Sequence, residues 1–251
     1  RLIRSGAKRP VLSVLLLISA VICTPLAIRA LEVDEPNAQD RQIVRTIAKR
    51  MKLFHLSNQD MDDDISKKGF QLYLKSLDPS KMYFYQSDID EFSASADELD
   101  DLAKSGDLSF AFAVFNRFLK RIEERLVVIN QLIESEHDFT LDEVMMTDSD
   151  ELEFAKNPAE LKDRWRKRIK YSMLVEKSEE TANEDAKNKL HRRYTSFAKR
   201  MNQFDAEEVT ELFLTSLTTA YDPHSTYFSQ STFDNFMIQM RLNLEGIGAS
   251  L

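Results

Sequence analysis

Glycine, proline and cysteine are scarce in this sequence. Its 251 residues include 5 Gly, 6 Pro and 1 Cys. Because glycine and proline mark turns and interrupt helices, their shortage favours helix almost everywhere, and so does the abundance of Leu, Lys, Glu, Ala and Arg. The single cysteine excludes a disulfide framework within the chain. A chain of this length must therefore hold a substantial core together by packing alone, as one large or two modest domains.

Motifs that bind cofactors or metals are also missing. The sequence contains no Gly-rich phosphate loop, no Gly-x-Ser-x-Gly elbow and no His-Glu-x-x-His pair. Asp60 to Asp64 resembles the opening of a calcium loop, but Ile65 stands where that loop needs Gly and Gln71 where it needs Glu. We interpret this acidic run as the N-terminus of a helix, where negative charge is favourable. We predict no cofactor, no metal and no catalytic residue in this chain.

Three neighbouring residues, Asp222, His224 and Ser225, combine the residue types of a hydrolytic triad. The members of a triad approach one another from different chain segments, so their adjacency argues against that geometry. We interpret them as parts of a turn. The four histidines are far apart in the sequence, at His55, His137, His191 and His224.

Residues 1–30 have the pattern of an export signal. Basic residues at the start are followed by an apolar run over 11–22, then Pro25 and a small residue, Ala30, at a cleavage point. Twelve apolar residues are too few for a membrane span, which needs about 20. We predict a cleaved signal peptide and an exported protein; an uncleaved membrane anchor is the alternative. Lipidation at Cys23 is not expected, because bulky Ile22 precedes it.

Periodic apolar residues predict an all-α, multi-helix domain over residues 31–241. One stripe, from Leu108 to Ile133, steps by 3 or 4 residues and predicts a long helix over 107–134 that packs in the core. Asp205 with Glu208 forms a capping box at the start of another helix. Further helices are predicted over 43–54, 65–77, 88–101, 159–177, 181–202 and 205–221, and Ser231 with Asp234 predicts the start of one more.

Charge is unevenly distributed along the chain. Residues 134–153 hold nine acidic residues and no Lys or Arg, which predicts a solvated, poorly ordered connector. Residues 156–200 hold fourteen Lys and Arg against seven Asp and Glu. These charges alternate along helices without interleaved aromatic residues, so nucleic acid is not predicted as a partner. We expect the basic region to face the connector or helix 88–101; attraction to a membrane surface or cell-wall polymer is the alternative.

One sixteen-residue pattern occurs twice. Residues 77–92 align without gaps with residues 221–236, and eight positions are identical. An aspartate before a proline disfavours helix, so each copy predicts a helix end, a turn and a new helix. The paired aromatic residues are expected to dock each turn on the core. The shared structural positions are Asp78, Pro79, Tyr83 and Phe84 in the first copy and Asp222, Pro223, Tyr227 and Phe228 in the second.

Residues 242–251 begin to alternate in the manner of a strand. Gly246 and Gly248 follow Leu242 and Leu244. Because the chain starts with Arg and stops at Leu251 inside this predicted strand, we expect that it is truncated at both ends.

The second copy, from Asp222-Pro223-His224-Ser225 to Tyr227 and then Leu244-Glu245-Gly246-Ile247-Gly248, resembles a hallmark of the carboxyl-terminal processing peptidases, and most closely of their tail-specific branch in Gram-negative bacteria. In that family the pattern stands just before a PDZ domain, so the resemblance implies that residues 242–251 are the start of that domain. The signal segment and the long helical region fit the same branch.

The resemblance implies a periplasmic serine protease whose PDZ domain captures the C-terminal carboxylate of a substrate. A serine and a lysine of lowered pKa would perform the chemistry, and both would lie outside residues 1–251. The implied partners are proteins with unstructured C-terminal tails and a lipoprotein adaptor. A non-catalytic helical adaptor module of the periplasm is the alternative function.

Overall fold

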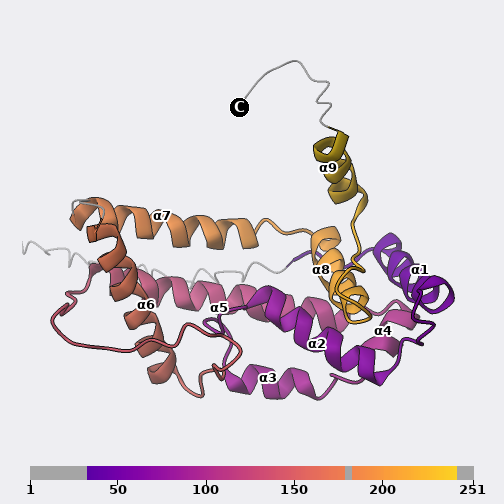
Figure 1. The fold of residues 1–251 in the computed structure, drawn as a ribbon, viewed down its shortest axis with the longest axis horizontal. Helices are drawn as coiled ribbons and strands as arrows, with labels where there is room; N and C mark the ends of the chain where they lie inside the picture. The colour runs from indigo at the N-terminus through magenta and orange to yellow at the C-terminus, as the bar shows by residue number, and fades with distance from the viewer. Residues whose placement is uncertain (1–32, 179–182, 242–251) are drawn as a thin grey trace, which may run out of the picture. The chain divides into compact units, whose positions relative to one another are not determined.

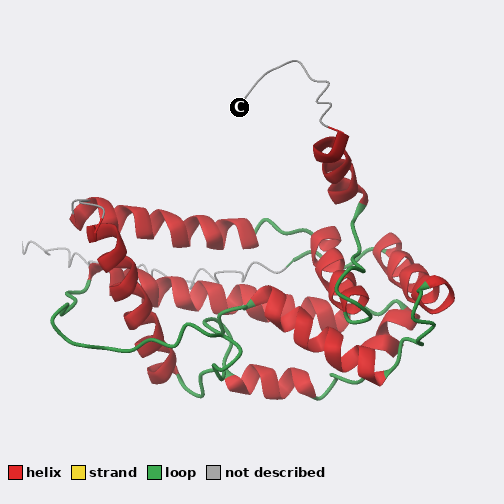
Figure 2. Ribbon diagram, in the orientation of Figure 1, coloured by secondary structure: helices red, strands yellow, loops and turns green. Residues whose placement is uncertain are grey.

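The computed structural model describes residues 33–178 and 183–241, which form nine α-helices and contain no β-strand (Figure 2). This confirms the predicted all-α fold. The predicted signal segment 1–30, the predicted strand over 242–251, and Gly246 and Gly248 lie outside the described residues. The helices are α1 (Ala38–Phe54), α2 (Asp63–Leu77), α3 (Gln86–Ser93), α4 (Leu99–Ser105), α5 (Ser109–Glu134), α6 (Pro158–Ser178), α7 (Asn183–Met201), α8 (Ala206–Thr219) and α9 (Gln230–Arg241).

Most helix boundaries follow the local sequence chemistry. The predicted capping box at the start of α8 is present, since Asp205 accepts a hydrogen bond from the backbone N–H of Glu208 at 2.9 Å and the Glu208 carboxylate accepts one in return. The single helix predicted over 88–101 is wrong. Tight turns after Phe92 end α3 at Ser93, and α4 begins only at Leu99. The small and polar residues between them bury too little to continue the helix.

The main core lies between α2 and α8 and is closed by α1, α4 and the first half of α5. Gly69 permits the close approach of α2 to α8, because a Cβ atom at this position would lie 2.7 Å from Cδ2 of Leu217. The first part of the predicted stripe of α5, from Leu108 to Leu126, faces this core, and Phe115, Phe118 and Ile122 are buried in it. Ile129 and Ile133, at its end, belong to the second core described below. The stripe is therefore packing surface, as its period predicted.

A second core lies where the end of α5 meets α6 and α7, which run past it in Figure 1. Leu161, Trp165, Ile169 and Met173 of α6 are buried in this cluster. Leu174, the residue after Met173, lies on the outer side of the helix and is exposed. The second core also buries Met82, which belongs to the turn between α2 and α3.

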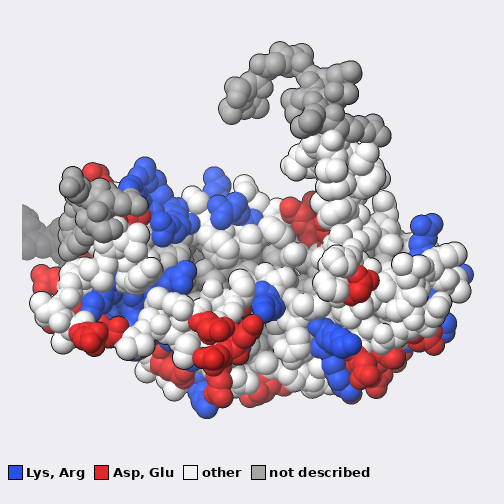
Figure 3. Space-filling model, in the orientation of Figure 1, with Lys and Arg blue, Asp and Glu red and all other residues white. Residues whose placement is uncertain are grey.

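The basic region pairs with the acidic connector, which was one of its two expected neighbours. Glu143 of the connector accepts hydrogen bonds from Arg166 at 3.1 Å and from Lys170 at 2.6 Å, both on α6. Figure 3 shows acidic and basic side chains close together over this part of the surface. Helix α3, part of the other expected neighbour, forms its ion pairs with α5: the buried carboxylate of Asp88 pairs with Arg117 and Arg121.

Within the part of the chain that the structure describes, no helix is both long enough and apolar enough to cross a membrane.

Candidate functional site

The candidate site consists of the two Asp-Pro turns and the helices that follow them. In the first turn, Asp78 ends α2 and its carboxylate accepts three backbone hydrogen bonds, from Met82 at 2.8 Å, Tyr83 at 2.8 Å and Phe84 at 3.0 Å. Asp78 is buried, and burial raises its pKa although the three N–H groups oppose this change. The buried carboxylate therefore fixes the path of the chain through the turn.

The aromatic residues of the first turn connect the two cores. Phe84 is 0% exposed, and its ring centroid lies 5.6 Å from that of Phe118 in the main core. Tyr83 packs against both cores, with its ring 5.5 Å from Phe118 and 5.6 Å from Trp165. The indole nitrogen of Trp165 donates a hydrogen bond to the carbonyl oxygen of Met82 at 2.9 Å. The first turn thus joins the main and second cores.

The second turn is held by a histidine from a distant part of the chain. The carboxylate of Asp222 accepts hydrogen bonds from the hydroxyl of Ser225 at 2.6 Å and the backbone N–H of His224 at 2.8 Å, and it pairs with Nε2 of His55 at 2.7 Å. These partners, the Ser225 hydroxyl first, lower the pKa of Asp222 to about 2. His55 is the C-terminal cap of α1, so this contact joins the end of α1 to the second turn.

The ring of His55 is oriented by a local turn. The backbone N–H of Ser57 donates to Nδ1 at 3.2 Å, and the Ser57 hydroxyl lies 2.8 Å from the same nitrogen. Since Nδ1 accepts this backbone hydrogen bond, the neutral ring carries its proton on Nε2 and donates it to Asp222. His55 also packs against Tyr221, with 4.9 Å between the ring centroids.

This cluster does not have the geometry of a hydrolytic triad. In a triad, one ring nitrogen faces the serine and the other faces the aspartate. Here Nε2 of His55 faces both Asp222 and Ser225, at 2.7 and 3.1 Å, and the hydroxyl of Ser225 donates to the carboxylate. His224 is exposed and only its backbone joins the turn. In the described residues, no group of three or more His, Cys, Asp or Glu could hold a metal ion.

His55 is the functional residue that the sequence did not reveal. It lies 167 residues before Asp222, and no spacing or motif connects the two positions. Only the packing of α1 against α8 brings them together. The sequence did indicate the turn itself, through Asp222, Pro223 and Ser225.

The two turns share more than their sequence. In each copy the backbone N–H three residues after the aspartate donates to the aspartate carbonyl, from Lys81 at 3.1 Å and from Ser225 at 3.2 Å. The next helix begins at equivalent glutamines, Gln86 and Gln230, and each glutamine donates to the aspartate four residues later, at 2.9 and 2.8 Å. The α9 start expected at Ser231 is one residue late, because Ser229 caps the helix by accepting the N–H of Thr232.

The two copies differ in burial. The Phe84 and Phe92 rings of the first copy lie 5.8 Å apart in the main core, and the equivalent Phe228 and Phe236 lie 5.6 Å apart at the surface. Phe228 is 38% exposed, so the expectation that it docks its turn on the core is wrong. Of the Tyr227–Phe228 pair, only Tyr227 packs against the main core.

Helix α9 therefore presents apolar side chains outward. It extends from the second turn away from the other helices in Figure 1, and the face of it seen in Figure 3 has almost no charge. Its exposed apolar side chains are Phe233, Phe236, Ile238 and Met240. Phe233, Phe236 and Met240 lie three and four residues apart on one face of the helix, and exposed apolar side chains grouped in this way are typical of an interaction site.

Comparison with known proteins identifies the family. A family model described as "Tail specific protease N-terminal domain" matches residues 47–231, which include every helix from α2 to α8 and both Asp-Pro turns. The chain belongs to the tail-specific protease family. A curated relative, the tail-specific protease of Haemophilus influenzae, is 31% identical over 203 residues, covering 80% of this chain.

The chain corresponds to the N-terminal domain of a tail-specific protease. The match spans 29% of the relative's length, so the chain covers less than a third of that protein. The predicted family and the predicted role as a helical N-terminal region of a C-terminal processing protease are both confirmed.

Proposed function

We propose that this domain is part of a serine endopeptidase of the periplasm that degrades proteins from their C-terminal tails. Membership of the tail-specific protease family carries the proposal. The cluster of His55, Asp222 and Ser225 supports the placing of the catalytic serine and lysine elsewhere in the full-length protein, because the Ser225 hydroxyl donates to the carboxylate of Asp222 and not to a ring nitrogen of His55. A PDZ domain in the same protein would capture the substrate's carboxylate.

The helical domain frames the catalytic parts and limits which substrates reach them. The first turn packs against both cores and so connects them. After the second turn, α9 extends away from the other helices. The apolar face of α9, with Phe233 and Phe236, supports this role, because it is suited to rest against a following domain.

The proposal is tested with the full-length protein and a folded reporter that carries an unstructured, apolar C-terminal tail. We expect the full-length protein to degrade this reporter and to spare the same reporter with a charged tail. The 251-residue chain should cleave neither reporter, with or without Ser225→Ala. Cleavage by the 251-residue chain that is lost on Ser225→Ala would place the active site at the second turn and overturn the proposal.

A second candidate function is a non-catalytic adaptor module that binds a partner. It is favoured by Leu53, Phe54 and Leu56, whose side chains are exposed around the end of α1. A lipoprotein adaptor, a membrane surface or the cell wall could cover them. This function becomes the better proposal if the full-length protein degrades no tailed reporter.

A further inference from the structure

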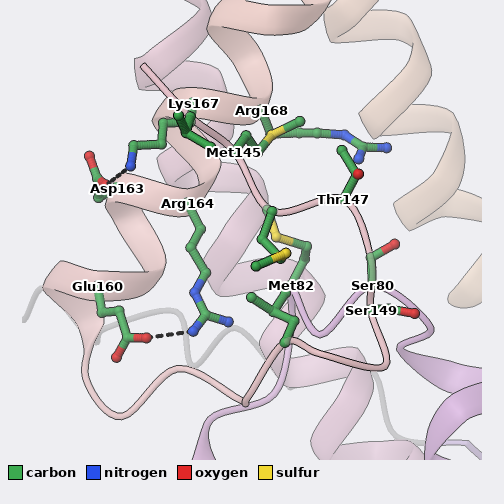
Figure 4. A pocket seen from close by; sticks show the side chains of 13 residues that line it. Ser80, Met82, Met145, Thr147, Ser149, Glu160, Asp163, Arg164, Lys167 and Arg168 are labelled. Atoms are coloured by element: carbon green, nitrogen blue, oxygen red, sulfur yellow. Dashed lines mark hydrogen bonds and ion pairs between the residues drawn. The ribbon is translucent and has the colours of Figure 1, made fainter. Parts of the chain in front are cut away.

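A cavity of about 370 Å³ lies between α6, the acidic connector and the first Asp-Pro turn (Figure 4). One wall is formed by the connector, whose residues 144–147 and 149 cross in front of α6, and by Ser80 and Met82 of the turn. The other wall is one face of α6. The size of this cavity falls in the range of ligand pockets, roughly 300–1,000 Å³.

The connector side of the cavity is apolar and adaptable. Met82, Met145 and Met146 all line it, together with Val144 and Leu152. Methionine side chains are unbranched and polarizable, so they can adjust to apolar groups of different shapes. A wall of this composition favours a ligand with apolar side chains of variable identity.

The α6 side of the cavity is basic. Arg164 pairs with Glu160 at 2.5 Å, and Lys167 pairs with Asp163 at 3.3 Å. Arg168 has no carboxylate partner in the described parts of the chain, and its guanidinium lies near the hydroxyl of Tyr194. In Figure 4 the side chain of Arg168 extends toward Thr147. The cavity therefore combines an apolar wall with a cation, Arg168, that no carboxylate of the described residues neutralises.

We propose that this cavity binds the end of a protein chain whose last side chains are apolar. The apolar side chains occupy the methionine wall, and the terminal carboxylate pairs with Arg168, whose planar guanidinium suits a carboxylate. The choice of a protein tail as the ligand rests on the proposed function. The site lies on the N-terminal domain, so it would hold a substrate before the tail reaches the catalytic parts.

The chain contains a natural fluorescent probe of this cavity. Trp165, the only tryptophan, donates a hydrogen bond to the carbonyl of Met82, and Met82 lines the cavity. A ligand that moves Met82 should change the environment of the indole ring. Tryptophan fluorescence can therefore follow binding without a label.

The experiment titrates the 251-residue chain with a short glycine–serine peptide that ends in Val-Leu-Val and a free carboxylate. Its matched control is the same peptide with a C-terminal amide. We expect saturable binding of the acid and at least about 10-fold weaker binding of the amide, equal to about 1.4 kcal/mol. Calorimetry under the same conditions confirms the affinities obtained from fluorescence.

Two variants separate the charge of Arg168 from its role in packing. Arg168→Glu should weaken binding of the acid about 10-fold or more, and Arg192→Glu makes the same charge change at an exposed position of α7 and should leave binding unchanged. Tyr194→Phe removes the hydroxyl beside Arg168 but keeps the charge of Arg168, so it should retain binding. Circular dichroism verifies that each variant is folded.

Three results would overturn the proposal: equal binding of acid and amide, undiminished binding by Arg168→Glu, or no binding of the peptide at about 1 mM. Measurements at that concentration detect interactions of about −4 kcal/mol. Binding of dodecanoate without binding of the peptide would also overturn it and assign the cavity to a fatty acid. The assay measures binding and no proteolysis. Its failure leaves the protease proposal intact, and failure of the reporter assay leaves the binding result intact.

Discussion

Nε2 of His55 lies 2.7 Å from the carboxylate of Asp222 and joins the C-terminal cap of α1 to the turn that precedes α9. The two equivalent aspartates have pKa values shifted in opposite directions. Burial raises the pKa of Asp78, and hydrogen bonds from Ser225, His224 and His55 lower that of Asp222 to about 2. The same turn chemistry thus occurs in a buried turn between the two cores in one copy and in a partly exposed turn between α8 and α9 in the other.

The carboxylate of Asp222 should make stability depend on pH in the acid range. Its folded pKa of about 2 lies below the value of about 3.9 for an unperturbed aspartate. The stabilising contribution is therefore fully present above about pH 4 and is lost as pH falls toward about 2. Urea unfolding should show Asp222→Asn to be less stable than the wild type at pH 6, with a difference that shrinks below pH 4.

Asp97→Asn, at an exposed position between α3 and α4, controls for the loss of one negative charge. His55→Ala should raise the pKa of Asp222, measured by carbon-detected NMR of its carboxyl group. An unchanged pKa in His55→Ala would show that the contact between His55 and Asp222 does not form in solution.

The sequence predicted the helices well because their apolar stripes and caps are local signals. The stripe of α5 and the capping box of Asp205 involve residues a few positions apart, and both are present. The break between α3 and α4 was missed because the small and polar residues after Ser93 can extend a helix or end it. Their conformation depends on where Leu99 and Ala103 reach the core, which is tertiary information.

The candidate site was predictable only in part, for the same reason. The repeat located both turns, but it could not show that Phe84 is buried and Phe228 exposed, because identical local sequences pack against different surroundings. His55 and the cavity beside α6 depend on contacts between distant segments. The cavity is formed where Met82 meets a connector more than sixty residues later.

Truncation of the equivalent phenylalanines should therefore have unequal effects. Phe84→Ala removes a ring that is 0% exposed and should lower the free energy of unfolding by about 3–5 kcal/mol. Phe228→Ala removes a ring that is 38% exposed and should cost at most about 1.5 kcal/mol. Urea unfolding followed by far-UV circular dichroism measures both. Equal losses would mean that Phe228 is covered in solution.

The hydrogen bond from Trp165 should stabilise the junction of the two cores. Trp165→Phe keeps an aromatic ring but leaves the buried carbonyl of Met82 without its donor, which should cost about 1–3 kcal/mol. Far-UV circular dichroism follows unfolding, since the variant has no tryptophan. Tyr171→Phe, at an exposed position of the same helix, should change stability by no more than about 0.5 kcal/mol. A loss in Trp165→Phe no larger than in this control would contradict the prediction.

Glu143 should hold the acidic connector on α6. Its carboxylate pairs with Arg166 and Lys170, and these partners, Arg166 first, lower its pKa to about 2. Glu143→Gln should speed amide hydrogen exchange over residues 137–153 at neutral pH and leave the exchange of α2 and α8 unchanged, because the connector opens locally. Glu153→Gln, which breaks an exposed pair with Lys156, is the matched control and should leave exchange over residues 137–149 unchanged.

The pairing of Glu143 with α6 should also control the cavity, because Met145 and Met146 follow Glu143 by two and three residues in the connector and line the cavity wall. In Glu143→Gln the wall is no longer fixed, so the affinity for the apolar peptide acid should fall together with the exchange protection. In the wild type, the stabilising contribution of the Glu143 pairs is fully present above the unperturbed glutamate pKa of about 4.3. It is lost as pH falls toward about 2, the pKa of Glu143 in the folded chain. Exchange of the connector should accelerate over that pH interval relative to the expected chemical rate, and Glu143→Gln should show no such acceleration. A variant that keeps wild-type exchange in the connector would show that contacts other than Glu143 position the methionine wall.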